Sequence, residues 1–304
     1  MRMARWFASL WMATFAVAGA EQIRIGTYNV NNYLDRAVGT RPAKSSAAKA
    51  KVRESLHALK ADVLALQEMG STNALLDLRA SLKDEGLDYP HWEHVRGFDT
   101  NIHVAILSRF PITACRHHTN NSFLLYGRRF RVSRAFAEAD IRVNPRYSFT
   151  LITAHLKSRR EVVEGDQAEI REQEAIALRE IIDRKFVANP NINLVVLGDF
   201  NDVKDAPSTR TLIGRGRNAL VDTRPIERNG DDLPHENPRF DPPHVTWTYY
   251  YGKEDSYSRV DYILLSAGMA REWNKGETQI LTLPNWALGS DHRPIVATFF
   301  AEER

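Results

Sequence analysis

A run of uncharged residues in this chain leads directly into two carboxylates and an amide. The stretch reads VVLGDFND and ends with Asp199, Asn201 and Asp202. Uncharged runs rich in valine and leucine indicate a buried strand. Carboxylates at the end of such a strand are costly to bury unless they have partners. A single acidic residue in this place is more often a turn or a helix cap, so the pattern becomes informative only where other strands share it.

Five further predicted strand ends carry polar side chains of the same kind. Three of these strands lead into their polar residues, and two begin beside them. If the sheets contain strands of both directions, all six ends can meet at one edge, which is where open sheets place their ligand sites. Along the chain, the residues are Asn29 and Asn31, Glu68, His155 and Lys157, Asp199 and Asn201, Asp261, and Asp291 and His292.

If these groups converge, they favour hydrolysis of a phosphoester with the help of a divalent cation. Glu68 together with aspartate and asparagine oxygens suits Mg²⁺, Mn²⁺ or Ca²⁺. The chain has one cysteine and no His-x₃-His pair, so a zinc site is not indicated. A cation also offsets the repulsion between buried carboxylates. His155, His292 and Lys157 supply donors for an anionic oxygen, and a carboxylate can orient the attacking water.

The elements that must position these residues follow from the hydrophobic pattern. Nine short runs rich in Val, Ile, Leu, Thr and aromatic residues predict strands, and helical spacing predicts at least three helices. The helices are expected at 46–60, around 75–82, and from Asp166, whose capping-box partner is Glu169, to just before Pro190. We therefore expect an α+β fold with two packed sheets and helices outside them. The expected strands are 23–30, 63–67, 103–108, 136–143, 148–154, 193–197, 245–250, 260–265 and 295–299.

The first twenty residues differ from the rest of the chain. Arg2 and Arg5 precede an apolar run, and Ala18 and Ala20 flank a glycine in the pattern of a signal-peptide cleavage site. The run is shorter than the roughly 20 residues that a spanning helix needs, although an N-terminal anchor helix remains the alternative. We expect a signal peptide over 1–20, cleavage near Ala20, and an exported protein, periplasmic or extracellular, with a single domain over 21–304.

Composition and charge narrow the class of protein. Hydrophobic residues make up 43% and charged residues 26% of the chain, which is typical of an ordinary globular domain. Loss of the first twenty residues would lower the formal net charge from +3 to +1, too little for a protein that coats nucleic acid. Cys115 has no second cysteine for an internal disulfide. We expect no stable membrane span and a monomer. The proline-rich segment 223–243 is predicted to be a long surface loop that borders the site.

The motifs, in their order along the chain, resemble the endonuclease/exonuclease/phosphatase superfamily, which has the DNase I-like fold. They are TYNVN, LQE, HL, GDFND, RVDYILL and GSDHRPI, and they extend from about Ile23 to Phe299. G-D-x-N and S-D-H at these distances are specific, whereas any one motif alone would be weak. The resemblance implies a four-layer α/β/β/α sandwich with two packed mixed β-sheets and a site at one edge.

The resemblance also implies a metal ion, Mg²⁺ or in its place Mn²⁺ or Ca²⁺, held chiefly by Glu68 with Asn29 and Asp291 nearby. It implies no other cofactor. The abasic-site endonuclease branch has Asn-x-Asp after the first strand, where this chain has Asn29 and Asn31, and tyrosine in place of His155. Abasic-site repair is therefore not expected.

Around the scissile phosphate, the resemblance implies a second group of residues. His155 binds the phosphate, and we expect Lys157 and Asn201 to contact it as well. Asp199 and Asn201 flank the phosphate and orient the attacking water. Asp261 orients a site histidine, and His292 is the histidine at the phosphate. Sequence leaves open which of two residues, Asp199 or His292, is the general base. The expected catalytic residues are His155, Asp199, Asn201, Asp261 and His292.

Three functions remain open at this point. We favour an exported phosphodiesterase acting on nucleic acid, because the arginines within 128–134 could follow a phosphate backbone. A sphingomyelinase-like enzyme or a phosphoinositide or small-molecule phosphatase would use the same core. The tyrosines at 249–251 could touch a membrane, although a strand with one buried face is the simpler interpretation. A catalytically silent binding module is the third alternative.

Overall fold

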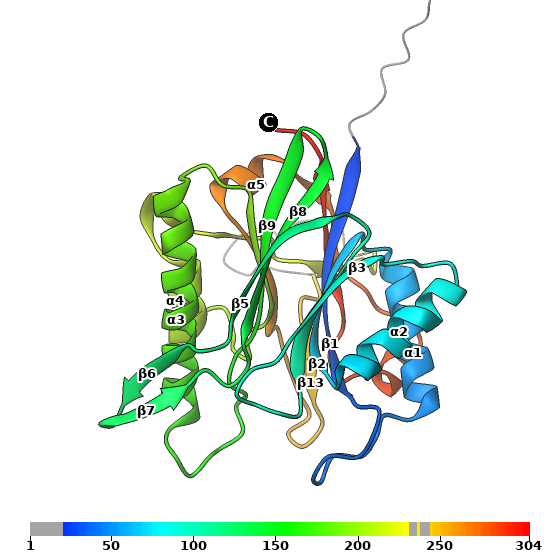
Figure 1. Cartoon of the computed structure of the whole chain (residues 1–304), viewed down its shortest axis with the longest axis vertical. Helices are drawn as coiled ribbons and strands as arrows, with labels where there is room; N and C mark the ends of the chain where they lie inside the picture. The colour runs from blue at the N-terminus through cyan, green and yellow to red at the C-terminus, as the bar shows by residue number, and fades with distance from the viewer. Residues whose placement is uncertain (1–20, 231–235, 238–243) are drawn as a thin grey trace, which may run out of the picture.

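Two large β-sheets pack face to face in the computed structural model, which describes residues 21–230, 236–237 and 244–304. Helices cover the outer face of each sheet (Figure 1). The helices α1 (Ser46–Leu59) and α2 (Thr72–Asp84) lie outside one sheet, and α3 (Gln167–Ala188) and α4 (Pro207–Ile213) outside the other. The expected four-layer α/β/β/α sandwich is confirmed. The expected signal peptide lies outside the described residues.

The two sheets have six and seven strands, and two short hairpins stand beside them. The seven-stranded sheet has the order β12 (Ile226–Glu227), β16 (Trp273–Ile280), β17 (Ile295–Phe300), β1 (Gln22–Tyr33), β2 (Val63–Met69), β4 (His103–Ser108) and β3 (His91–Val95). The six-stranded sheet has the order β11 (Val221–Asp222), β15 (Asp261–Leu265), β10 (Leu194–Asp199), β9 (Tyr147–His155), β8 (Phe136–Asn144) and β5 (Ile112–His118). The hairpins are β6 (Ser122–Leu125) with β7 (Arg128–Arg131) and β13 (Tyr249–Tyr251) with β14 (Ser256–Ser258); a short helix, α5 (Ala267–Arg271), precedes β16.

Strand direction explains how distant residues reach one edge. Each sheet has a parallel pair at its centre, β1 with β2 and β9 with β10, and all four carboxyl ends lie at the same edge. The neighbouring strands β15 and β17 run antiparallel to these pairs and begin at that edge. Asp261 therefore lies opposite Asp199, and Ile295 lies opposite Thr27. The mixed strand directions that the sequence required are present.

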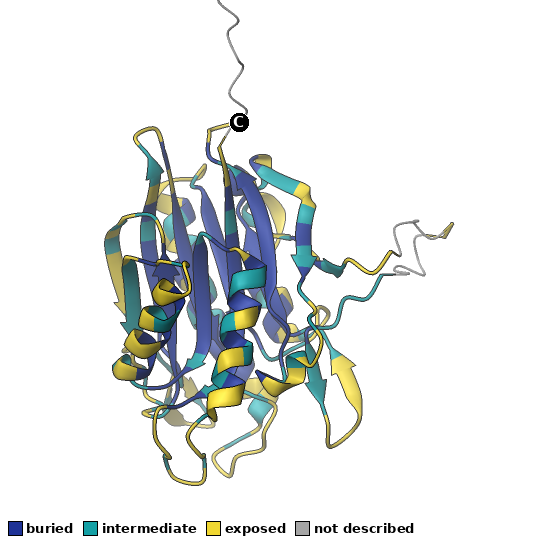
Figure 2. Cartoon of the chain, turned by 90° about the vertical axis from the view of Figure 1, so that its right-hand side faces the viewer, coloured by how far each residue is buried: buried dark blue, intermediate teal, exposed yellow. Residues whose placement is uncertain are grey.

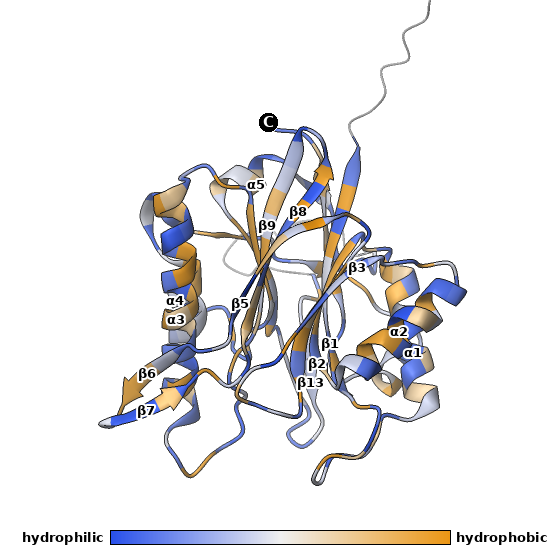
Figure 3. Ribbon diagram, in the orientation of Figure 1, coloured by the Kyte–Doolittle hydropathy of each residue, from blue (hydrophilic) through white to orange (hydrophobic). Residues whose placement is uncertain are grey.

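The core between the sheets is built from the inward-facing residues of both. It includes Ile25, Ala65, Val195 and Ile263, all fully buried. Figure 2 shows the buried strands between helices whose outer faces are exposed, and Figure 3 shows apolar and polar residues alternating along the helix ribbons. At the start of α3, the Asp166 carboxylate accepts hydrogen bonds from two backbone amides, which is the expected N-cap. Among the helices in the described part of the chain, none combines the length and the apolar character needed to cross a bilayer.

The structure differs from the sequence prediction mainly at edges and loops. The predicted strand 245–250 is wrong for its first four residues, because β13 begins only at Tyr249. The Thr248 hydroxyl instead accepts hydrogen bonds from the amides of Val260 and Asp261, which ties this segment to the start of β15. Sequence patterns also missed β3, β5 and β16, whose polar residues hide the strand signal. The predicted loop 223–243 contains β12, and its residues 231–235 and 238–243 lie outside the described part.

A buried carboxyl group near the C-terminus provides a test of the fold. Glu272 is fully buried, and the Tyr147 hydroxyl donates a hydrogen bond to it. Burial raises the pKa of Glu272 to about 7, whereas an exposed glutamate titrates near about 4.3. Because the folded pKa is the higher one, the neutral group stabilises the fold at acidic pH. That contribution is lost as the pH rises through about 7.

The unfolding free energy of wild type should fall as the pH rises from 5 to 8. In Glu272→Gln, we expect this fall to be smaller by on the order of 1–2 kcal/mol. Urea denaturation of variant and wild type at both pH values measures this difference. Glu302→Gln is the control, because Glu302 is half-exposed and pairs with Arg304, and it should lose as much stability as wild type. An equal loss in Glu272→Gln and wild type would contradict the prediction.

Candidate active site

The structure brings eight of the ten residues that the sequence singled out into direct or near contact at this edge. They come from the ends of β1, β2, β9 and β10, from the start of β15, and from the segments that follow β10 and precede β17. Their roles remain predictions. The eight are Asn29, Glu68, His155, Asp199, Asn201, Asp261, Asp291 and His292.

The Asn29 side chain lies at the centre of the group and is buried. Its amide nitrogen donates to Asp199 Oδ2 at 2.9 Å and lies 3.4 Å from Glu68 Oε1. It also lies 3.4 Å from His292 Nε2. Its Oδ1 accepts from the backbone amide of Asn31 at 3.0 Å, which fixes the orientation of the amide group. One side chain therefore connects residues from both sheets.

A buried histidine lies between two aspartates. His292 Nδ1 is 2.9 Å from Asp261 Oδ2, and His292 Nε2 is 3.8 Å from Asp199 Oδ2. Burial alone would lower the pKa of His292, but Asp261 and Asp199 raise it above its ordinary value. Burial raises the pKa of Asp199. The imidazolium form of His292 is thus favoured beside a carboxylate that is ready to take up a proton.

Asn201 holds Asp199 in place. Its backbone amide donates to Asp199 Oδ1 at 2.8 Å, and its side-chain amide donates to Asp199 Oδ2 at 3.2 Å and to Leu156 O at 3.0 Å. This geometry depends on a left-handed backbone at Asn201, with φ 55°, a conformation that asparagine tolerates better than most residues. Both oxygens of Asp199 therefore have donors, which lowers the cost of burying the carboxylate.

His155 is buried at the end of β9 beside the same carboxylate. Its Nε2 lies 3.4 Å from Asp199 Oδ2 and 4.0 Å from Glu68 Oε1. Burial lowers the pKa of His155 well below its ordinary value, and the nearby Arg134 and Arg41 lower it further. The imidazole is therefore neutral and can donate one hydrogen bond into the site.

Glu68 and Asp291 form an oxygen-rich side of the site. Glu68 Oε2 accepts from the backbone amide of Asn32 at 2.8 Å, and its side chain remains 18% exposed, so solvent ions can reach it. The pKa of Asp291 is raised by burial and by the negative charge of Glu68. Two carboxylates that repel each other beside the Asn29 amide fit a hard divalent cation.

A second set of ligand atoms could hold a cation. One ligand atom from each of Asp199, Asp261 and His292 lies within 4.8 Å of the others. However, the imidazole Nδ1 and an Asp261 oxygen already share a proton at 2.9 Å, and a cation there would have to displace it. The carboxylates of Glu68 and Asp291 are therefore the better fit. Asn29 turns its amide nitrogen, a donor, towards Glu68 and Asp199 while its oxygen accepts from Asn31, so its role as a metal ligand stays a prediction.

The sequence analysis missed two basic side chains, Lys44 and Arg41, in the loop that follows β1. Lys44 Nζ donates to Asn31 O at 2.8 Å, and burial lowers the pKa of Lys44 to about 8 although Asp291 and Glu68 are near. Arg41 Nη1 is buried and has no hydrogen-bond partner among the described residues. A buried donor without a partner, close to His155, is suited to an anionic ligand. No spacing in the sequence pointed to these residues.

Two basic residues of the sequence analysis have structural contacts. The Lys157 ammonium donates to the carbonyls of Ser158 at 2.9 Å and Arg160 at 2.7 Å. The structure thus directs Lys157 to its own loop, and its contact with a phosphate stays a prediction. Arg134, which the sequence placed in a basic surface cluster, is buried and lies 3.7 Å from Asp99.

Tyrosines of β13 border the site. The ring of Tyr249 lies 4.7 Å from the ring of His292, and it stacks on Tyr251 at 6.3 Å with an interplanar angle of 22°. Arg159 is near enough to Tyr249 for its charge to act on that ring, and it donates to Asn201 O at 3.2 Å. Flat aromatic rings and the side chain of an arginine therefore lie beside the carboxylates.

Comparison with known proteins places this arrangement in a family. The model of the Endonuclease/Exonuclease/phosphatase family matches residues 26–292. Among solved structures, the human Nocturnin catalytic domain with bound sulfate anion is 17% identical, with a TM-score of 0.63 over 91% of this chain and 94% of that one. Truncated Caenorhabditis elegans TDP2 is 15% identical, with a TM-score of 0.60 over 92% and 98% of the two chains.

Sphingomyelinase C from Streptomyces griseocarneus is 18% identical, with a TM-score of 0.61 over 92% of this chain and all of that one. At these identities, the structural likeness shows the fold. No curated protein matches the sequence. The family model, however, covers most of the described chain and includes every residue of the site. The chain therefore belongs to the Endonuclease/Exonuclease/phosphatase family, whose members hydrolyse phosphoesters.

Proposed function

We propose that this protein is an exported phosphodiesterase that cleaves nucleic acid with a divalent cation, Mg²⁺ or in its place Mn²⁺ or Ca²⁺. One observation carries the proposal of hydrolysis: the buried His292 lies between Asp261 and Asp199, directly beside the oxygen ligands. A proton acceptor, a cationic donor and a cation site in contact are what in-line attack on phosphorus requires. Export rests on the pattern of the first twenty residues.

In this proposal, the Asp199 carboxylate activates the attacking water by taking its proton. A bound divalent cation would supply positive charge that stabilises negative charge developing on the phosphate oxygens. Asp199 takes the proton from water, because its pKa is raised by burial and Asn201 holds both of its oxygens. His292 is already protonated between two carboxylates, so it is better suited to donate than to accept.

The remaining donors stabilise the phosphate. His292 presents its Nε2 towards the site, while Asp261 holds the imidazolium through Nδ1. His155 is neutral and offers a hydrogen bond, and Arg41 has a buried nitrogen without a partner among the described residues. Fixed donors of this kind act strongly because little water surrounds them.

The border of the site supports nucleic acid as the substrate. Tyr249 and Tyr251 present stacked rings next to His292, and bases stack on such rings at about 1–3 kcal/mol each. Lys44, near Asp291 and Glu68, and Arg159, beside Asn201, add positive charge. Flat rings beside cations suit a polymer of bases and phosphates.

A different surface favours a phospholipid substrate as the second candidate. The β6–β7 hairpin exposes Leu124 and Tyr126, which are 67% and 55% accessible, next to Arg128 and Arg129. Apolar side chains flanked by arginines are suited to a membrane surface with anionic headgroups. In Figure 1, the hairpin projects from the fold beyond α3.

A panel of substrates tests the proposed function. We expect cleavage of plasmid DNA or RNA that stops when a chelator removes the cation, and slow or no turnover of sphingomyelin vesicles and of a simple phosphomonoester. Hydrolysis is measured side by side for all four. Faster turnover of sphingomyelin would favour the second candidate, and no hydrolysis of any substrate would favour the silent binding module.

A Tyr251→Ala variant tests whether the tyrosine rings of β13 bind nucleic acid. Loss of one stacking ring should raise KM for nucleic acid about tenfold, from the 1–3 kcal/mol of one stacked base, with little change for a small phosphodiester. Tyr126→Ala on the β6–β7 hairpin is the control, because its ring is exposed and far along the chain from β13. Equal KM values for Tyr251→Ala and wild type would remove the tyrosines from substrate binding.

Substitutions in the polar group test the mechanism. Asp199→Ala, His155→Ala and His292→Ala should each lower turnover by at least about 10²-fold, because each removes a group that stabilises the transition state. Circular dichroism checks that the fold is retained. His57→Ala is the control, since His57 pairs with Glu85 on the surface. Near-normal turnover in any two of the three variants would exclude the assigned roles.

The cation site has a separate test. Glu68→Gln removes a charged oxygen ligand, so we expect the Mg²⁺ concentration that gives half-maximal rate to rise about tenfold or more. Titration of the rate with Mg²⁺ measures this shift. Glu85→Gln changes a surface carboxylate that pairs with Arg53 and should leave the titration unchanged. An unshifted curve for Glu68→Gln would take Glu68 out of the metal site.

A further inference from the structure

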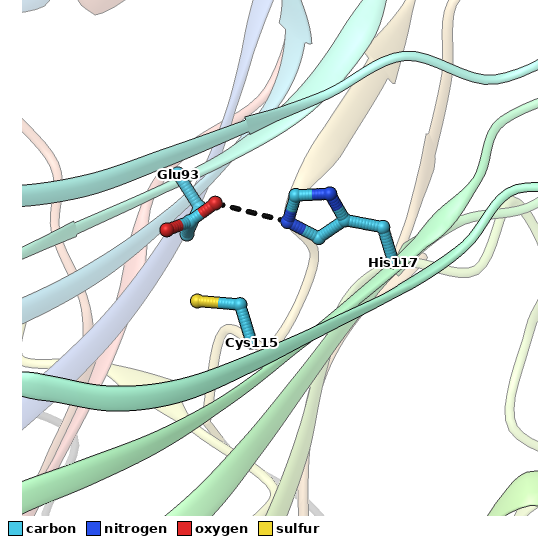
Figure 4. Close-up of side chains that lie close together, drawn as sticks. All are labelled: Glu93, Cys115 and His117. Carbon is cyan, nitrogen blue, oxygen red and sulfur yellow. Dashed lines mark hydrogen bonds and ion pairs between the residues drawn. The ribbon is translucent and has the colours of Figure 1, made fainter.

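A second cluster of metal-binding side chains lies away from the candidate active site. It consists of Glu93 on β3 and Cys115 and His117 on β5, and we name it the edge cluster. β3 is the last strand of the seven-stranded sheet, and β5 is the last strand of the six-stranded sheet. Figure 4 shows the three side chains meeting between these two strands. The cluster thus bridges the open edges of the sandwich.

Strand alternation shows that the three side chains point into the space between the sheets. Val95, two residues after Glu93, is buried in the core between the sheets. Cys115 lies opposite Ala139, and His117 lies opposite Ala137, and both alanines also belong to that core. The orientation therefore follows from the fold of both strands and does not depend on one flexible side chain.

The residues between them point the other way. Arg116 and His118 contact Glu138 on the outer face of the six-stranded sheet. Their side chains thus lie on the opposite face of the strand from the edge cluster. Within the cluster, His117 Nε2 donates a hydrogen bond to the Glu93 carboxylate.

The ligand atoms are already close. Glu93 Oε2 lies 2.9 Å from His117 Nε2, and one ligand atom of each residue lies within 4.8 Å of the other two. Neighbouring ligands of a tetrahedral zinc ion are separated by about 3.3–3.8 Å, given bond lengths of about 2.0–2.3 Å. The nitrogen and oxygen need to separate by only a few tenths of an ångström. The sulfur can approach by rotation, since Cys115 is exposed.

We propose that Glu93, Cys115 and His117 form a second metal site that binds a borderline transition-metal ion such as Zn²⁺. A thiolate and an imidazole select this class of ion over Mg²⁺ and Ca²⁺, which prefer oxygen ligands only. Three protein ligands leave a fourth position for water. This site goes beyond the proposed hydrolysis, because its ligands are chemically distinct from the oxygens around Glu68.

Binding at this site exchanges protons in a defined way. The Cys115 thiol loses its proton to solvent and binds as thiolate. The proton on His117 Nε2 moves through solvent to Nδ1, so that the neutral imidazole binds the ion through Nε2, and the hydrogen bond to Glu93 is replaced by one bond from each residue to the ion. Without an ion, partial desolvation of the sulfur and the hydrogen bond and negative charge of Glu93 raise the pKa of Cys115 to about 12, so the sulfur stays protonated.

The location gives the ion a structural role. The edge cluster takes its sulfur and nitrogen from one sheet and its oxygen from the other. An ion held by all three would tie the two free edges together, and it would bind the folded chain only. Zn²⁺ should therefore raise the melting temperature.

Cobalt absorption tests the proposal on the full chain, kept reduced. Co²⁺ should give a thiolate-to-cobalt charge-transfer band with one ion per chain, and Zn²⁺ should displace it. Cys115→Ser should lose the band, and Glu93→Gln and His117→Gln should bind Co²⁺ at least tenfold more weakly. Zn²⁺ should raise the melting temperature of wild type but not of Cys115→Ser.

Two controls separate the edge cluster from its surroundings. His118→Gln changes the neighbouring histidine on the other face of β5 and keeps a donor for Glu138, and Glu68→Gln changes the other cation site. Both should retain the band. The proposal is overturned if wild type gives no thiolate band, or if Glu93→Gln and His117→Gln bind Co²⁺ as tightly as wild type. An unchanged melting temperature with Zn²⁺ would overturn the structural role.

Discussion

The hydrogen bond between the Asn29 amide and the Asp199 carboxylate is the contact on which the candidate active site depends. These residues are 170 positions apart and belong to central strands of different sheets: Asn29 lies in the second half of β1, and Asp199 is the last residue of β10. Each sheet supplies only half of the polar groups, so the site exists only while the sheets keep their relative position. A shift of one residue would turn these side chains to the opposite face. The apolar core between the sheets therefore has a direct chemical role: it holds the two halves in register.

The polar groups at this edge divide into two sets with different charge balance. Asp199, Asp261 and His292 balance much of their charge internally, because the imidazolium lies between two carboxylates. Glu68 and Asp291 have no such partner inside the pair, and the negative charge of Glu68 helps to raise the pKa of Asp291. In the proposed mechanism, proton transfer and cation binding thus belong to neighbouring residues that need not compete. A single cluster of carboxylates without this division would take up protons and lose its affinity for a cation.

The sequence predicted the buried strands and the residues at their ends well, and it predicted the exposed edge strands poorly. The runs that end at Asn29, Glu68, His155 and Asp199 are rich in buried apolar residues, so their strands and their shared edge could be predicted. The edge strand β5 alternates between the inner and the outer face with polar residues on both, so it has no apolar pattern. The approach of Arg41 to His155 depends on a loop conformation, and single-sequence patterns carry no signal for that.

Backbone strain also gathers at this edge, which explains why the stretch VVLGDFND has its glycine. Gly198 has φ 137°, and a Cβ there would lie 2.0 Å from the carbonyl oxygen of Ala154. Only glycine therefore lets β10 approach β9 closely enough to place Asp199 in register with His155. Glu68, at φ 61°, also has the left-handed backbone, which costs on the order of 1–3 kcal/mol. Such strain persists only where the surrounding packing enforces it, and here the buried sheets enforce it at the residues proposed to carry out the chemistry.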